Sequence, residues 1–192
     1  MQGLQIRQIS ESIRVGILDL KSFSAAEGIT VKREQEKAGT RHLLGKMLNT
    51  QDFVLDYTGE RKPFIKARTE HISISHSHDK LAIVIDELKP TGIDIELIRE
   101  KVRQIEHKFL REDESAMAAG NTEMLINFWA AKETLYKVYG LKQVDFKKHL
   151  FIEKFTDKEI TARIQTGEIN KRYRLASEKI EGYRLVYVVN EI

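Results

Sequence analysis

The 192-residue sequence predicts an α+β fold, because strand-like and helix-like segments occupy separate stretches of the chain. Strand patterns crowd between residues 71 and 96, helical spacing follows up to Tyr139, and strand patterns return after residue 149. This order predicts two α/β halves, residues 1–98 and 99–192, in one compact unit. The two halves share no recognisable residue-level repeat.

In the first half, β-branched residues predict strands over residues 4–20, with a turn near Gly16. Apolar side chains three to five positions apart predict a helix over residues 31–48, and residues 53–57 form a short strand candidate. Three further strands are expected at residues 71–75, 81–85 and 91–96. The middle one is apolar throughout, which is typical of a central strand.

In the second half, Val102, Ile105 and Phe109 mark the apolar face of one helix. A longer helix is predicted over residues 122–139, and Gly140 is positioned to end it. Four short alternating segments then predict an antiparallel meander, at residues 150–155, 159–165, 173–177 and 183–189.

Composition excludes several functional classes. The chain has no cysteine, which excludes disulfides, thiolate metal sites and a cysteine nucleophile, and fits a cytoplasmic location. No run of 18 apolar residues exists and the first ten residues lack an apolar stretch, so we expect neither a membrane span nor a signal peptide. The net charge of +3 suits nucleic acid, a phosphate-bearing molecule, an acidic protein or solubility alone.

Two carboxylates are expected side by side on one strand. Asp94 and Glu96 are two residues apart and therefore point to the same face, whereas Ile93 and Ile95 point to the core. Like charges this close favour a neutralising cation, and Mg²⁺ typically takes one or two carboxylates together with substrate phosphates. A solvated strand face is the alternative interpretation.

A second candidate site lies on the predicted long helix. Glu133 and Lys137 are four residues apart and share a face, Trp129 lies one turn before Glu133, and Lys132 lies about 100° around the helix. A surface ion pair and a core tryptophan would produce the same pattern.

Polar residues near strand ends supply candidate phosphate ligands. Ser75 and His76 carry a hydroxyl and an imidazole that can bind phosphate. Zinc bound by His71, His76 and His78 is an alternative, but the spacing resembles no familiar zinc pattern. A Ser-His hydrolase is a further alternative, although the sequence lacks a Gly-x-Ser-x-Gly motif.

Consecutive cations precede a proline-fixed bend at Arg61-Lys62-Pro63, where they can hold a phosphate or simply form an exposed basic turn. Arg41, on the first predicted helix, allows the same two interpretations. The sequence contains neither a P-loop nor a Rossmann fingerprint, so a nucleotide would be held in another way.

The order of these blocks resembles the motif series of the 4′-phosphopantetheinyl transferase superfamily. The blocks are Lys62-Pro63, Ile74-Ser75-His76-Ser77, Gly92-Ile93-Asp94-Ile95-Glu96 and Trp129-Ala130-Ala131-Lys132-Glu133. G-I-D-x-E and W-x-x-K-E-x-x-x-K are the most specific pair, and the resemblance runs from Arg41 to Lys137, half the chain. Arg61 departs from the family's usual Gly, and His78 from its usual Gly or small residue.

The resemblance implies an enzyme, a holo-[acyl-carrier-protein] synthase. Such an enzyme transfers the 4′-phosphopantetheine of coenzyme A to a serine of an acyl or peptidyl carrier protein and releases 3′,5′-ADP. The length resembles the surfactin-type branch, generally a monomer of two similar halves with pseudo-twofold symmetry and coenzyme A in the cleft between them. The carrier would serve fatty acid, polyketide or non-ribosomal peptide synthesis.

The resemblance also implies residue roles. Asp94, Glu96 and Glu133 would be ligands of Mg²⁺, or of Mn²⁺, with the coenzyme A pyrophosphate completing the shell. Arg41, Lys62 with Pro63, His76 and Ser75 would hold the nucleotide and its phosphates. Lys132 and Lys137 would contact the pyrophosphate. In the expected reaction Glu133, or a water on the metal, takes the serine proton, and Lys137 protonates the departing phosphate.

Glu114 resembles an acidic residue near the metal, a position for which Glu112 and Asp113 compete. A non-catalytic coenzyme A-binding module would not need three carboxylates. A nucleic-acid-binding protein would need a contiguous basic face, whereas the cations here are interspersed with acids. We therefore expect coenzyme A and a carrier protein as partners, with no nucleic acid and no membrane.

Overall fold

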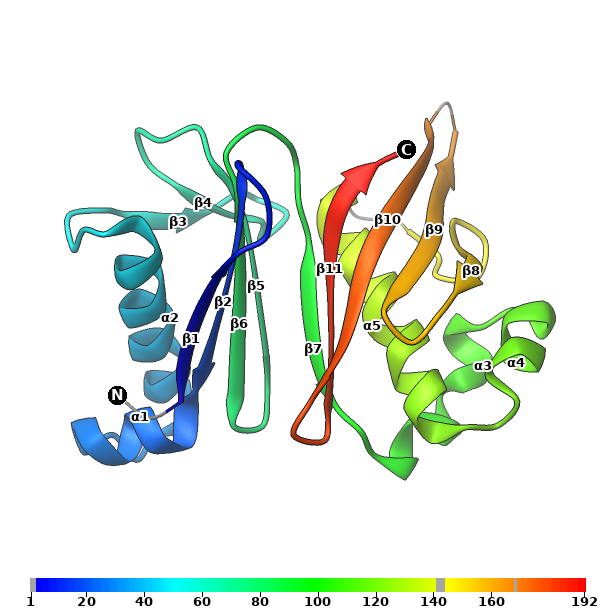
Figure 1. Ribbon diagram of the computed structural model, residues 1–192, viewed down its shortest axis with the longest axis horizontal. Coiled ribbons are helices and arrows are strands. Elements are labelled where there is room, and N and C mark those ends of the chain that lie inside the picture. The colour runs from blue at the N-terminus through cyan, green and yellow to red at the C-terminus, as the bar shows by residue number, and fades with distance from the viewer. Residues whose placement is uncertain (1–2, 141–143, 168) are drawn as a thin grey trace. The chain divides into compact units, whose positions relative to one another are not determined.

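The computed structural model describes residues 3–140, 144–167 and 169–192. Over these residues it has a mixed architecture of five α-helices, one 3₁₀ helix and three sheets (Figure 1). The predicted α+β class is therefore confirmed. The chain divides into two compact units, unit 1 (Met1–Ile95) and unit 2 (Glu96–Ile192). The division falls inside strand β7 (Ile93–Leu97).

Unit 1 is built on a four-stranded antiparallel sheet with the order β1-β2-β6-β5. Its strands are β1 (Leu4–Gln8), β2 (Ile13–Asp19), β5 (His71–Ser77) and β6 (Lys80–Asp86). Strand β6 lies inside the sheet and is buried along its whole length, as its apolar sequence predicts.

The predicted turn near Gly16 is wrong, because Gly16 lies inside β2 and the turn spans residues 9–12. A Cβ on Gly16 would lie 2.5 Å from Met47 Sδ and 2.9 Å from Leu43 Cδ1. Both residues belong to helix α2 (Lys32–Leu48), so the glycine permits close packing of this helix on the strand.

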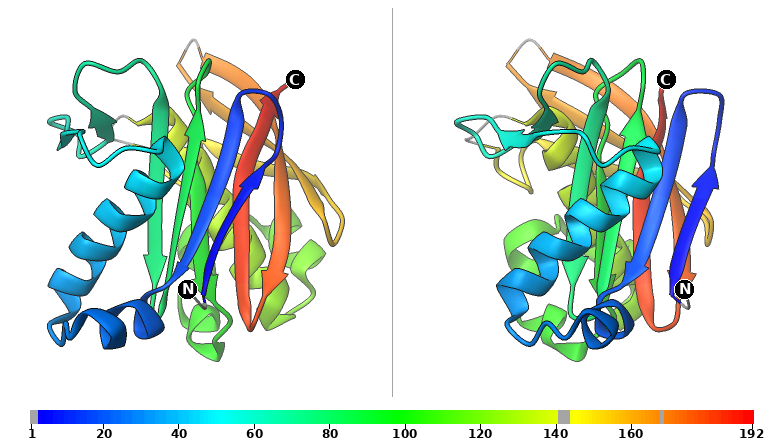
Figure 2. Two further views of the ribbon diagram at one scale, coloured as in Figure 1. Left: turned by 60° about the vertical axis from the view of Figure 1, so that its left-hand side comes forward. Right: turned by 90° about the vertical axis from the view of Figure 1, so that its left-hand side faces the viewer.

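Helix α2 confirms the helix predicted over residues 31–48 and lies across one face of the unit 1 sheet (Figure 2). Its Leu43, Leu44 and Met47 are buried in the core of this unit. Two elements were not predicted, namely helix α1 (Leu20–Glu27) and strand β4 (Pro63–Ile65). Strand β4 pairs antiparallel with β3 (Leu55–Tyr57).

Unit 2 contains the five-stranded sheet with the order β7-β11-β10-β9-β8. The strands after β7 are β8 (Leu150–Phe155), β9 (Glu159–Thr166), β10 (Ile169–Ile180) and β11 (Tyr183–Glu191). Their neighbouring pairs are antiparallel, which confirms the predicted meander. Helix α5 (Thr122–Tyr139) packs against this sheet through fully buried Leu125, Phe128 and Leu135 (Figure 1).

The bounds of α5 agree with the predicted helix. The Asn121 side chain accepts a hydrogen bond from the Met124 backbone N–H at 3.1 Å, and Gly140 ends the helix with φ of 69°. The single helix expected around residues 102–109 is instead a series of short elements. They are η1 (Glu100–Gln104), α3 (Glu106–Phe109) and α4 (Glu112–Ala118). Among the described residues, no helix has the length and apolar character needed to cross a membrane.

Asp19 links β2, α1 and β6 and gives a test of this arrangement. Its carboxylate accepts hydrogen bonds from the Ser22 backbone N–H at 2.7 Å and from Lys80 Nζ at 2.9 Å. Partial burial raises the pKa of Asp19, but the bonds from Lys80 and Ser22 outweigh burial and lower it overall. The folded state therefore gains stability from the ionised carboxylate above the unfolded pKa of about 3.9, and loses it as pH falls through the lower folded pKa.

We expect Asp19→Ala to lower the free energy of unfolding by about 1 kcal/mol or more at pH 7, because the helix cap is lost. Asp19→Asn keeps a capping oxygen and loses the charge, so its deficit relative to wild type should shrink as pH falls below about 4. Urea unfolding of the three proteins between pH 3 and 7 measures this. A deficit of Asp19→Asn that does not change with pH would contradict the assignment.

Candidate functional site

The side chain of Asp94 is held inside unit 1 by serines of a neighbouring strand. Asp94 is only 3% exposed, and Ser75 Oγ donates a hydrogen bond to its Oδ1 at 2.7 Å. Ser75 Oγ also accepts from the Ile95 backbone N–H at 3.3 Å, and Ser73 Oγ accepts from the Ile93 N–H at 3.2 Å. Alternate hydroxyls of β5 therefore fix the backbone of β7 and orient its carboxylate. Ile93 and Ile95 are fully buried, as expected.

Arg41 lies in a cavity of about 680 Å³ in unit 1. Its guanidinium donates to the Gln51 carbonyl at 3.0 Å and lies 5.0 Å from the centre of the Phe53 ring. The cavity also contacts Pro63 and His76, two other predicted site residues. The half-exposed His76 imidazole lies 3.4 Å from Glu36, as measured from Nδ1 to Oε1.

Two cations of this cavity, Arg33 and Lys37, were not predicted. They precede Arg41 by eight and four residues on α2, so all three project from one side of the helix. That spacing is visible in the sequence and is the signal that could have identified them. With Arg61, four cations and the His76 imidazole line this cavity, and Phe53 and Tyr57 lie in its wall, which suits a phosphorylated aromatic ligand.

Lys62 lies beside the same cavity, between its lining residues Arg61 and Pro63. Burial lowers the pKa of Lys62 below its ordinary value. The pKa of His71 is lowered first by burial and then by the positive charge of Lys62. A lysine whose charged form is disfavoured by burial gains from a nearby anion, which is consistent with a phosphate ligand.

In unit 2, Glu96 is paired with the only tryptophan of the chain. Trp129 Nε1 donates a hydrogen bond to Glu96 Oε1 at 3.2 Å. The indole packs between Phe109, with ring centres 5.0 Å apart, and Phe146, at 5.5 Å. Glu133 lies one turn further along α5 and is half-buried, as is Lys137.

Lys132, the neighbour of Glu133, is fully buried. Its Nζ donates to Glu114 Oε2 at 2.5 Å, to the Phe109 carbonyl at 2.7 Å and to the Phe146 carbonyl at 3.0 Å. Burial lowers the pKa of Lys132, and the charge of Glu114 opposes that shift. Glu114, which the resemblance places near a metal ion, is fully buried and is the partner of this ammonium.

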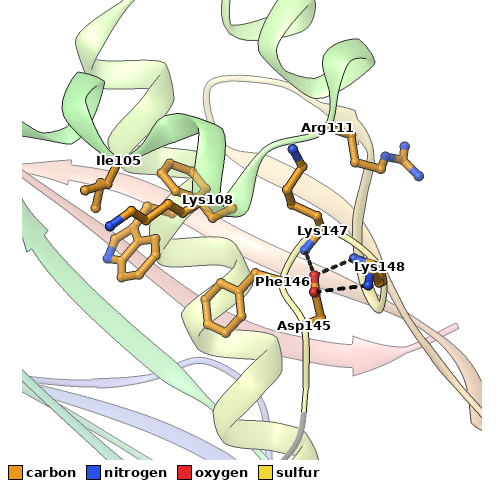
Figure 3. A pocket seen from close by; sticks show the side chains of 9 residues that line it. Ile105, Lys108, Arg111, Asp145, Phe146, Lys147 and Lys148 are labelled. Carbon is orange, nitrogen blue, oxygen red and sulfur yellow. Dashed lines mark hydrogen bonds and ion pairs between the residues drawn. The ribbon is translucent and has the colours of Figure 1, made fainter.

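A second cavity, of about 750 Å³, lies beside Trp129 in unit 2. Figure 3 shows Ile105 and Lys108 near one end of it, Arg111 toward the other, and the segment from Asp145 to Lys148 along its side. The Asp145 carboxylate accepts from the backbone N–H groups of Lys148 and Lys147, at 3.0 and 2.9 Å, which together lower its pKa (Figure 3). This turn fixes the position of Phe146 in the wall of the cavity.

The predicted metal ligands lie in different units, Asp94 in unit 1 and Glu96 and Glu133 in unit 2. Over residues 3–140, 144–167 and 169–192, no three His, Asp or Glu side chains are already gathered in a metal-binding cluster. The donor set nevertheless fits a hard divalent cation. All three groups are carboxylates, and hydrogen bonds from Ser75 and Trp129 orient two of them.

The backbone explains two unusual positions in the sequence. Arg61 has φ of 67° and His78 has φ of 51°, so both adopt the left-handed conformation that favours glycine. These are the two residues that depart from the glycine or small residue usual in the resembling family. The backbone is therefore strained at Arg61, shortly before β4, and at His78, directly after β5.

Comparison with known proteins adds one finding. Residues 90–188, more than half of the chain, match the family model ACPS, described as the 4′-phosphopantetheinyl transferase superfamily. The matched region contains Asp94, Glu96, Lys132, Glu133 and Lys137. It begins after the predicted nucleotide ligands of unit 1. A search of curated proteins found no match.

We expect Arg61→Gly and His78→Gly each to raise the free energy of unfolding by about 0.5–1 kcal/mol, because glycine removes left-handed strain that exceeds its own entropic cost. Glu60→Gly in the same turn, where φ is not positive, is the control and should destabilise. Urea denaturation of the three variants gives the comparison. Loss of stability in both Arg61→Gly and His78→Gly would refute the strain argument.

Proposed function

Because the chain belongs to the 4′-phosphopantetheinyl transferase superfamily, we propose that it transfers 4′-phosphopantetheine from coenzyme A to a serine of an acyl or peptidyl carrier protein, with Mg²⁺ or Mn²⁺. The observation that carries this proposal is the family match over residues 90–188. That region joins an acidic strand, with Asp94 and Glu96, to a helix that carries Lys132, Glu133 and Lys137.

The proposed enzyme is a holo-[acyl-carrier-protein] synthase of the surfactin-type branch, acting as a monomer in the cytoplasm. Two compact units of nearly equal length support this branch, whose members have two halves. The family match lies almost entirely in unit 2, so unit 1 provides a second half outside the matched region. Each unit combines an antiparallel sheet with a long helix packed on it, α2 in unit 1 and α5 in unit 2. This likeness supports the proposed relationship between the halves by a pseudo-twofold axis.

In the proposed reaction, the carrier serine Oγ forms a bond to the β-phosphorus of coenzyme A. The bond between that phosphorus and the oxygen bridging to the α-phosphate breaks, and 3′,5′-ADP leaves with the bridging oxygen. The serine hydroxyl loses its proton to a base. Negative charge accumulates on the phosphate oxygens, so positioning and electrostatic stabilisation supply most of the rate enhancement.

Asp94, Glu96 and Glu133 are the proposed ligands of the divalent ion, which when bound neutralises charge on the diphosphate. We assign Glu133 as a candidate acceptor of the serine proton, and Lys137, one turn further along α5, as the donor to the departing phosphate. The hydrogen bonds from Ser75 to Asp94 and from Trp129 to Glu96 keep these carboxylates oriented before substrate binds.

The 680 Å³ cavity of unit 1 is the proposed site for the nucleotide end of coenzyme A. Arg33, Lys37 and Arg41 offer three cations to the phosphates of that end, and His76 lies in the same wall. Lys62 lies beside this cavity, and Ser75 is hydrogen-bonded to Asp94. Together with Pro63 they complete the proposed set of nucleotide ligands. Nucleotide binding does not require a P-loop here, because side-chain cations can bind the phosphates in place of backbone N–H groups.

The function is tested by incubating the chain with coenzyme A, Mg²⁺ and a panel of apo carrier proteins, and measuring the intact mass of each carrier. We expect at least one carrier to gain one phosphopantetheine. Glu133→Ala and Asp94→Ala should each slow this gain by about 100-fold or more, because each removes charge stabilisation worth several kcal/mol.

Glu11→Ala is the control, since Glu11 is an exposed acid in the turn that spans residues 9–12. It should leave the rate within about two-fold of wild type. Absence of mass gain on every carrier would overturn the proposed function. Near-normal turnover by a folded Glu133→Ala or Asp94→Ala variant would instead overturn the assignment of the metal ligands.

A further inference from the structure

We propose that Lys132 is a positioning residue that fixes the Trp129–Glu96 pair, and that it does not contact the diphosphate of the substrate. The inference rests on the proposed function only in treating Glu96 as a metal ligand. It differs from the role implied by sequence resemblance, in which Lys132 meets the pyrophosphate. All the residues that carry it, from Glu96 to Ile152, belong to unit 2.

The Lys132 ammonium has three N–H donors, and three protein acceptors occupy them. These acceptors are Glu114 Oε2 at 2.5 Å, the Phe109 carbonyl at 2.7 Å and the Phe146 carbonyl at 3.0 Å. The side chain is 0% exposed. A phosphate oxygen would have to displace one of these acceptors, and a displaced buried acceptor would lose its hydrogen bond.

Glu114 makes such a displacement more costly, because it is equally buried and its carboxylate is already fixed. Its Oε2 also accepts from the Arg111 backbone N–H at 3.0 Å, and its Oε1 accepts from the Ile152 N–H at 2.8 Å. If Lys132 turned toward a substrate, the Glu114 charge would remain buried without its cation. The ion pair therefore holds the end of α3, the start of α4, α5 and β8 together.

The two carbonyls bound by Lys132 belong to the residues whose rings enclose Trp129. Phe109 contacts the indole edge-on, with ring centres 5.0 Å apart, and Phe146 lies at 5.5 Å. One ammonium thus fixes the backbone at both walls around the indole. Trp129 in turn donates its Nε1–H to Glu96 Oε1 at 3.2 Å.

The resulting chain of contacts runs from Lys132 through Phe109 and Phe146 to Trp129 and ends at a carboxylate. A donor such as an indole N–H orients a carboxylate that binds a metal ion. Loss of the network should therefore weaken metal binding, whereas loss of a phosphate ligand would weaken coenzyme A binding.

The test uses Lys132→Met combined with Glu114→Gln, which removes both buried charges and preserves side-chain length. Trp129→Phe is the second variant, because it removes the N–H donor and keeps an aromatic ring at this position. Lys158→Met, on an exposed turn, is the control. For each protein we would measure the affinity for Mn²⁺ in the presence of coenzyme A and the KM for coenzyme A at saturating Mn²⁺. For the proteins that retain Trp129 we would also measure its intrinsic fluorescence.

We expect both test variants to weaken Mn²⁺ binding by about tenfold, the usual effect of removing a partner that orients a metal ligand. The KM for coenzyme A should stay within about two-fold of wild type. The emission of Trp129, the only tryptophan, should shift to longer wavelength in the Lys132→Met/Glu114→Gln protein, because the indole loses its fixed walls. Lys158→Met should match wild type in all three measurements.

A tenfold rise in KM for coenzyme A with unchanged Mn²⁺ affinity would overturn the proposal and return Lys132 to the diphosphate. Unchanged Trp129 emission in the double variant would also overturn it. If the double variant does not fold, Trp129→Phe decides, since normal Mn²⁺ affinity in that protein contradicts the proposal. The fluorescence and Mn²⁺ measurements do not require transfer, so a failure of the proposed function would be recognised separately by the absence of carrier modification.

Discussion

The buried ammonium of Lys132 is the constraint on which the organisation of unit 2 depends. Burying this charge is tolerable only because Glu114 supplies the opposite charge and two backbone carbonyls accept its remaining hydrogens. Those acceptors come from separate short elements and a turn. A single side chain of α5 therefore orders the irregular segments around Trp129, and the cavity of about 750 Å³ forms among them.

In unit 1, serine hydroxyls rather than a buried ammonium hold the local structure in place. Ser73 and Ser75 of β5 accept hydrogen bonds from the backbone of β7, and Ser75 also donates to Asp94. Helix α2 covers the sheet closely because Gly16 leaves room for Met47, and the same helix carries Arg33, Lys37 and Arg41 to a cavity. In each unit a side-chain donor thus orients a carboxylate, and a cavity of the same unit is lined by cations. This pairing of anion and cations suits a metal ion with a phosphorylated substrate.

The regular elements could be predicted because local patterns determine them. The bounds of α5 follow from Asn121 and Gly140, and the continuous apolar run of β6 identifies a central strand. The turn near Gly16 was misplaced because a glycine that permits close packing looks like a turn residue in the sequence. The partnership of Lys132 with Glu114 could not be predicted, because it joins residues 18 positions apart through tertiary packing. For the same reason, the resemblance of the W-x-x-K-E motif predicts a phosphate as the partner of Lys132, whereas in the structure Lys132 binds the buried carboxylate of Glu114.

The central proposal is that Asp94, Glu96 and Glu133 bind one divalent ion together with coenzyme A. Titration of Mn²⁺ followed by electron paramagnetic resonance, in the presence of coenzyme A, tests it most directly. The account predicts one tightly bound Mn²⁺ per chain, and loss of that binding in Asp94→Asn, Glu96→Gln and Glu133→Gln alike. Tight binding of one Mn²⁺ that survives in any of these three folded variants would contradict it.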